Sequence, residues 1–238
     1  MPANPPRAIV DYCGEEYVVP DDGILTIGRD ADVDIDENPY LHRRFIELAF
    51  QSEILWITNV GSTSTATLSD GDGLVQTWLS PGARLPVLFP QTIVWFTAGP
   101  TTYDFEIKLD AAPFLANTDI SSPDDGETTL GRVTLTPDQR LIIVALAEDL
   151  LRRGNRGSGT IPASSAAAER LGWTITKFNR KLDNVCEKFS KLGVRGLIAE
   201  NGRPASNRKA RLVEYCLASR VITRTDLAWL DSAALSKS

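Results

Sequence analysis

The hydrophobic pattern changes its period once along the chain, and this change limits the folds available to it. From residue 8 to residue 109, short apolar runs recur between turn signals such as Pro20–Gly23 and Asp70–Gly73. β-Branched and aromatic runs at this spacing predict strands, and no helical period extends across the region. About 100 residues are enough to bury a core between two sheets. An antiparallel β-sandwich is therefore predicted here, with strands at Ala8–Val10, Tyr17–Val19, Ile24–Ile27, Phe45–Leu48, Ile54–Ile57 and Ile93–Phe96. Trp56 and Trp95 are expected to fill it.

Beyond residue 132 the apolar period becomes helical. Thr136 followed by Pro137 predicts a helix start, with Gly154 at its end. After a Gly-rich loop over 155–160, Ser164 or Ser165 is expected to cap a short Ala-rich helix that Gly172 closes.

Thr174 then predicts the cap of a longer helix over residues 175–192. Its residues Phe178, Leu182, Val185 and Phe189 share one apolar face. Residues 194–198 are expected to form a strand and residues 201–204 a turn, together making a wing. Ser206 and Asn207 are expected to cap a last helix over residues 208–220.

Residues 110–131 connect these two regions and contain Pro, Ser, Asp and Gly with few apolar residues. This composition is typical of a linker without its own core. The predicted organisation is thus a sandwich (8–109), an acidic linker (110–131) and a mainly α domain (132–238). Thr128 and Thr129, preceded by acidic residues, are candidate phosphorylation sites; the alternative is that these threonines have no role.

The charge of the chain is distributed very unevenly. Residues 1–131 hold 6 Lys or Arg and 21 Asp or Glu, a formal charge of −15, whereas residues 132–238 hold 19 and 10, a charge of +9. Such a reversal predicts different partners for the two halves, with a polyanion such as duplex DNA favoured for the basic half. A basic helix face that is simply solvated is the alternative.

Composition argues against several classes of function. The single histidine, His42, and the absence of paired acid–base or nucleotide-binding motifs favour a protein that is not an enzyme and needs no metal or cofactor. Three widely spaced cysteines fit reduced thiols better than disulfides. No apolar run is long enough to cross a membrane and no apolar leader is present, so a cytoplasmic location is expected.

One constellation in the sandwich region suggests anion binding. Gly28 and Arg29 end a predicted strand, His42 and Arg43 precede another, and Ser62, Thr63 and Ser64 follow a third. With Arg44, the arginines of this group are half of the six basic residues in the acidic half. Arginine, histidine and hydroxyl side chains together supply the donors that a phosphate group needs.

The order and spacing of these residues resemble the forkhead-associated (FHA) domain, a β-sandwich that binds phosphothreonine peptides through loops at one end. The resemblance covers residues 8–109 and implies a phosphopeptide site at Arg29, His42, Arg43, Ser62, Thr63 and Ser64. The sequence departs from the family at three positions. His42 stands where the family has a phosphate-contacting serine, Phe45 replaces a structural histidine, and Ser64 replaces the asparagine that holds the peptide main chain. These departures leave open a degenerate FHA fold that binds proteins without phosphate.

The short helix, Gly turn and Thr-capped helix over residues 164–192 resemble the helix-turn-helix of DNA-binding proteins, with a winged-helix-like arrangement behind it. That resemblance implies a second helix whose first turns enter the major groove. Its polar face and the basic residues of the wing and last helix are the candidate DNA contacts, which are Thr174, Thr176, Lys177, Asn179, Arg180, Lys181, Arg195, Arg203, Arg208 and Lys209.

Together these features predict a non-catalytic signalling protein. An FHA-like module would recognise a phosphothreonine partner, or the chain's own linker, and a basic domain would bind DNA as a transcriptional regulator. The alternative is a phospho-independent scaffold in a multiprotein assembly without DNA binding. The sequence does not determine an oligomeric state, a DNA target or a kinase.

Overall fold

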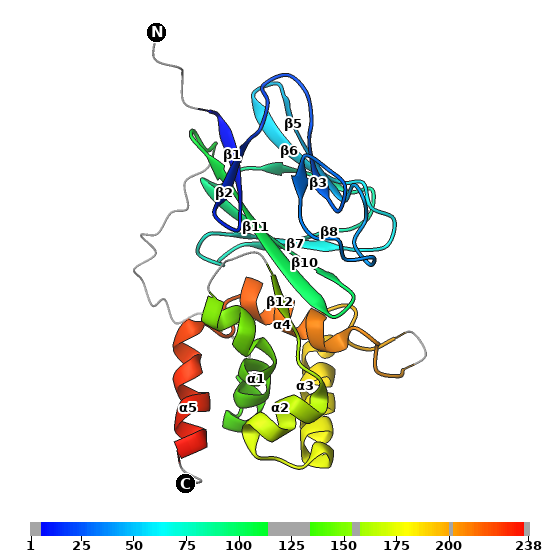
Figure 1. The fold of residues 1–238 in the computed structure, drawn as a ribbon, viewed down its shortest axis with the longest axis vertical. Helices are drawn as coiled ribbons and strands as arrows, with labels where there is room; N and C mark the ends of the chain where they lie inside the picture. The colour runs from blue at the N-terminus through cyan, green and yellow to red at the C-terminus, as the bar shows by residue number, and fades with distance from the viewer. Residues whose placement is uncertain (1–5, 114–133, 154–157, 200–201, 236–238) are drawn as a thin grey trace, which may run out of the picture.

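The computed structural model describes residues 6–113, 134–153, 158–199 and 202–235. A β-sandwich formed by residues 8–109 lies against a group of helices formed by the C-terminal region (Figure 1). The predicted strand-rich and helical regions are confirmed. The linker threonines Thr128 and Thr129 lie outside the described residues. Within the described part of the chain, no helix is both long and apolar enough to span a membrane.

The sandwich contains two sheets whose neighbouring strands are antiparallel, apart from one short parallel pair, β3–β4. One sheet has the order β2 (Glu15–Val18), β1 (Ala8–Tyr12), β11 (Thr101–Leu109), β10 (Gln91–Ala98), β7 (Ala66–Asp70) and β8 (Gln76–Leu79). The other has the order β4 (Val33–Asp34), β3 (Leu25–Gly28), β5 (Ile46–Gln51), β6 (Ile54–Asn59) and β9 (Arg84–Val87).

Strand β10 is buried on both faces, which explains its continuous apolar run. Val94 and Phe96 point into the sandwich core, whereas Ile93 and Trp95 pack outward against Ala218 of the helical part. The expectation that Trp95 fills the sandwich is therefore wrong. Because side chains alternate along a strand, Trp95 must leave the core when Val94 and Phe96 enter it. Trp56 also lies outside the sandwich core. It is half-buried, with the Arg84 guanidinium over its ring.

The helical part contains α1 (Pro137–Arg153), α2 (Ser164–Leu171), α3 (Ile175–Lys191), α4 (Arg208–Ala218), a 3₁₀ turn (η1, Arg224–Asp226) and α5 (Leu227–Leu235). The predicted cap of α3 is present, since the Thr174 hydroxyl accepts from the Lys177 amide. Gly172 closes α2 in the left-handed conformation. Neither serine caps α2, because Ala163 occupies the N-cap position, and Asn207 precedes α4 without a side-chain bond to it.

The predicted wing strand over 194–198 is absent. Gly193 and Gly196 have φ values of +91° and +82°, which interrupt an extended backbone. Only a single antiparallel bridge, between Ile198 and Pro204, remains.

The sandwich and the C-terminal region share a sheet and a buried polar contact, so they pack directly against each other. Ser158–Thr160, expected to be loop, forms strand β12 and pairs with the β11 segment Thr101–Tyr103. Helix α4 packs on the outer face of β7, β10 and β11. Glu214 of α4, fully buried, accepts hydrogen bonds from Thr67 (2.6 Å) and Thr97 (3.0 Å) of the sandwich.

Candidate functional site

Three loops meet at one end of the sandwich and bring the predicted anion-binding residues together. The Arg29 amide donates to the His42 carbonyl (3.0 Å), and the Asp30 amide donates to the Arg43 carbonyl (3.1 Å). Gly28 permits this approach, because a Cβ at this position would collide with the Arg43 carbonyl. The Gly-Arg pair and the His-Arg turn are thus joined through their backbones.

His42 connects the second loop to the third. Its Nε2 lies 3.1 Å from the Thr63 hydroxyl, within hydrogen-bond distance. Gly61 makes room for the ring, since a Cβ there would lie 2.8 Å from the His42 ring and 2.9 Å from Phe45. Phe45, which stands where the FHA family has a histidine, is fully buried and packs against Phe96 in the core.

Asn59, at the end of β6, holds the third loop and was not singled out in the sequence. Its side chain is fully buried. Its Nδ2 donates to the carbonyls of Ser64 (2.8 Å) and Leu79 (2.9 Å), and its Oδ1 accepts from the Gly61 amide (2.9 Å). The available signal was its place in β6, where an amide follows Leu55 and Ile57 at an inward-facing position.

Two arginines of the site, Arg29 and Arg43, have no ion-pair partner among the described residues, whereas Arg44 lies close enough to Asp32 to help lower the pKa of that carboxyl. Arg29 is half-buried, and its Nε is buried without a hydrogen-bond partner among the described residues. Arg43 and Arg44 are exposed, and within the described ranges neither they nor Arg29 form an ion pair. Arg7 and Lys108, by contrast, are paired with Asp21 and Asp11. Buried donors normally find partners, so Arg29 is suited to an anionic ligand.

Two exposed carboxylates of the nearby acidic run form hydrogen bonds with side chains of the strands. Asp32 accepts from the amide (2.9 Å) and hydroxyl (2.7 Å) of Thr26, and these bonds lower its pKa. Asp36 accepts from the Tyr103 hydroxyl at 2.6 Å. Burial, together with that bond, raises the pKa of Tyr103 to about 12. These hydrogen bonds fix the positions of the two carboxyl groups, but they do not remove the negative charge that the acidic run places near Arg29.

Of the remaining predicted residues, Ser62 is exposed, as is Thr63, whereas Ser64 is half-buried. Ser64 lines a hollow together with Arg195 of the helical part. The structure therefore places the third loop between the arginine-bearing loops and the helices.

No protein-family model and no curated protein matches this chain. Among solved structures, the FHA-1 domain of Mycobacterium tuberculosis Rv1747 is similar over 44% of this chain and 98% of its own, with 18% identity and a TM-score of 0.33. The MEK1 FHA domain in complex with a phosphothreonine peptide of HOP1 is similar over 44% of this chain and 99% of its own, with 9% identity and a TM-score of 0.33. Another structure of the MEK1 FHA domain is similar over 44% of this chain and 90% of its own, with 11% identity and a TM-score of 0.34.

The similarity concerns the sandwich alone. All three matched chains correspond to the N-terminal part of this protein, and none covers its helices. The TM-scores are low, so the ligand of this chain has to be inferred from its own residues.

The candidate DNA contacts do not form one free surface. Thr174, Thr176, Asn179 and Arg180 are exposed, on the side of α3 away from its buried face. Four other side chains of this set already contact residues of the chain itself. Lys177 lies over the Trp173 ring, Lys181 pairs with Asp138, Arg208 with Asp183, and Lys209 donates to the Pro162 carbonyl. Burial, with the nearby Arg208, lowers the pKa of Lys209.

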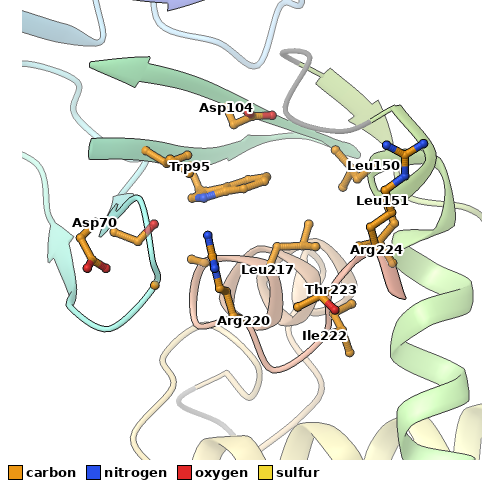
Figure 2. Close-up of a pocket in the computed structure, with 14 residues that line it drawn as sticks. Asp70, Trp95, Asp104, Leu150, Leu151, Leu217, Arg220, Ile222, Thr223 and Arg224 are labelled. Atoms are coloured by element: carbon orange, nitrogen blue, oxygen red, sulfur yellow. The ribbon is translucent and has the colours of Figure 1, made fainter. Parts of the chain in front are cut away.

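A separate cavity of about 250 Å³ lies where the outer sheet face meets the helical part. Figure 2 shows Trp95 between strand β10 and Leu217 of α4, with Arg220 beside it. The Trp95 Nε1 is buried without a partner among the described residues. No group of His, Cys, Asp or Glu in the described part of the chain is arranged to hold a metal ion. The cavity belongs to the joint between the two parts.

Proposed function

We propose that this chain is a non-catalytic recognition protein whose sandwich binds a phosphothreonine-containing segment of a partner. The observation that carries the proposal is the unpartnered Arg29 beside the His42–Thr63 contact. Arg29 and Arg43 would bind the phosphate, and the Thr63 and Ser62 hydroxyls would add neutral donors. The sequence resemblance to FHA domains supports the same ligand class.

The direct test is a binding titration of the full chain with a library of phosphothreonine peptides and its unphosphorylated copy. The phosphorylated library is expected to bind at least about tenfold more tightly, because charge-assisted hydrogen bonds contribute about 1.5–3 kcal/mol. Arg29→Gln should remove that preference. Arg84→Gln, which changes a sandwich arginine stacked on Trp56, is the matched control and should leave it unchanged.

Equal binding of both libraries would overturn the proposal and favour the phospho-independent scaffold. A peptide copying residues 122–135, phosphorylated at Thr128 or Thr129, extends the same titration to the chain's own linker. Tighter binding of that peptide than of the library average would identify an internal ligand.

A second candidate function is binding of duplex DNA through the first turns of α3. The exposed side chains of Thr176, Asn179 and Arg180 favour it, because hydroxyl, amide and guanidinium groups are suited to base edges and phosphates. Affinity for a duplex should then fall steeply with salt concentration, and Arg180→Gln should reduce the slope of log affinity against log salt by about one phosphate contact. A duplex affinity that does not depend on salt would exclude this function.

A further inference from the structure

A groove runs along the line where the loop end of the sandwich meets the start of α4. One hollow of about 330 Å³ is bordered by Thr63, Ser64 and Thr97 of the sandwich and by Arg195 and Arg211 of the helical part. A second hollow, of about 480 Å³, lies beside Tyr40 and Lys209. The two hollows share Ser206 and Asn207, so they lie next to each other at the start of α4.

The chemistry of the first hollow favours an anion. Its lining combines the guanidinium groups of Arg195 and Arg211 with hydroxyls of Thr63, Ser64 and Thr97, and no carboxylate lines it among the described residues. Arg195 is exposed and forms no ion pair within the described ranges. Arg211 forms an ion pair with buried Glu214, so Arg195 is the lining arginine whose charge is not paired within the described ranges.

The hollow adjoins the proposed phosphate site through Thr63. The hydroxyl of this residue lies 3.1 Å from His42 Nε2, and the same residue borders the hollow beside Ser64 and Arg195. A peptide bound at Arg29 and His42 could therefore extend directly into the groove.

We propose that the groove binds a second anionic group of the same ligand, a carboxylate or a further phosphate a few residues from the phosphothreonine. Arg195 is the principal contact, and Arg211 forms the wall behind it. The helical part thus takes part in selecting the phosphopeptide. The inference rests on the proposed function of the neighbouring site.

The test uses the full chain and two peptide libraries with randomised flanks, one carrying a central phosphothreonine and one carrying threonine. Recovered peptides are sequenced for the wild-type protein, for Arg195→Gln and for Arg153→Gln. Arg153 is the matched control because it is exposed, pairs with Asp149 on its own helix as its one partner among the described residues, and does not line the groove. Single peptides are then titrated with Asp, Asn or phosphoserine at the selected position, which distinguishes a carboxylate from a phosphate.

We expect Asp, Glu or phosphoserine to be enriched on one side of the central residue. Replacing the selected acid by its amide should weaken binding about tenfold, as loss of a charge-assisted contact predicts. Arg195→Gln should abolish both effects, and Arg153→Gln should retain them. An absence of acidic enrichment in both libraries, or enrichment that survives in Arg195→Gln, would overturn the groove proposal. If the wild-type protein binds the phosphothreonine and threonine libraries equally well but still enriches acidic residues, the proposed function alone is overturned.

Discussion

At the residue scale, the candidate site depends on two glycines where a larger side chain would collide with a neighbouring loop, and on one asparagine whose amide binds loop backbone. Gly28 and Gly61 let two loops approach closely, and Asn59 satisfies backbone groups of a third. None of the three is among the residues proposed to contact the phosphate. They fix the loops on which Arg29, His42 and Thr63 stand.

Asn59→Ala should lower the free energy of unfolding by about 2–4 kcal/mol, because it leaves the Ser64 and Leu79 carbonyls and the Gly61 amide without their partner. Urea denaturation measures this loss. Asn184→Ala, on the exposed side of α3, is the control and should change stability by less than about 0.5 kcal/mol. A loss for Asn59→Ala as small as that of the control would show that the loop does not depend on the amide.

At the scale of single elements, helix starts differ in how strongly their sequence specifies them. Thr174 caps α3 with its hydroxyl, and Thr136 forms a reciprocal pair with Gln139 at the start of α1. Ser164 and Ser165 stand before the Ala-rich run in a similar pattern, yet both are part of α2, whose N-cap is Ala163. A serine before an Ala-rich run is therefore an incomplete signal for the exact boundary.

Thr174→Ala should destabilise the protein by about 1 kcal/mol through loss of the bond from the Lys177 amide. Ser165→Ala should have almost no effect, since no cap is lost and alanine favours a helix. Thermal or urea unfolding of the two variants gives the comparison. If both variants lose the same stability, the cap assignments of α2 and α3 are wrong.

The α1–α2 pair should confer a specific acid sensitivity. Burial alone would raise the pKa of Glu148, but hydrogen bonds from Arg170 and Arg152 lower it overall. A carboxylate whose folded pKa is depressed stabilises the fold above its unfolded pKa, and this contribution is lost as the pH falls through the folded pKa. Glu148→Gln should therefore make stability less dependent on pH below about pH 4.5, by up to about 1.4 kcal/mol per pH unit. Urea midpoints measured above and below about pH 4.5 check this, and parallel curves for both proteins would contradict it.

At the scale of the whole molecule, the sandwich and the helical part pack directly against each other. Strand β12 extends a sandwich sheet, and Arg220 donates to the Gly71 carbonyl across the joint. Ile93 and Trp95 are buried only because α4 covers them. The acidic and the basic halves of the chain therefore share an interface, and we predict that they unfold together.

Glu214→Ala should cost about 3–5 kcal/mol, because it leaves Arg211 and the hydroxyls of Thr67 and Thr97 at a buried joint without their acceptor. The unfolding curves from tryptophan fluorescence, to which all five tryptophans contribute, and from far-UV circular dichroism should coincide in the wild-type protein. Glu214→Gln keeps an acceptor in place and should cost less. Two separate transitions in the wild-type protein would show that the parts unfold independently.

The sequence by itself determined the class of each region, the main strands and helices, and the loops that carry Arg29, His42 and Thr63. It could do so because these features follow from local patterns: hydrophobic period, turn residues and short motifs. Asn59 was within reach of the same reasoning, as an amide at an inward position of its strand.

Only the tertiary structure decided that Trp95 faces the helices, that residues 158–160 form a strand, and that Arg195 stands beside the loop of Ser64. An apolar strand run indicates that both faces are covered, but it does not identify the covering element. That identity depends on contacts such as Thr67 with Glu214, 147 positions apart in the chain. Such contacts form only when the two parts pack together, so no local pattern can specify them.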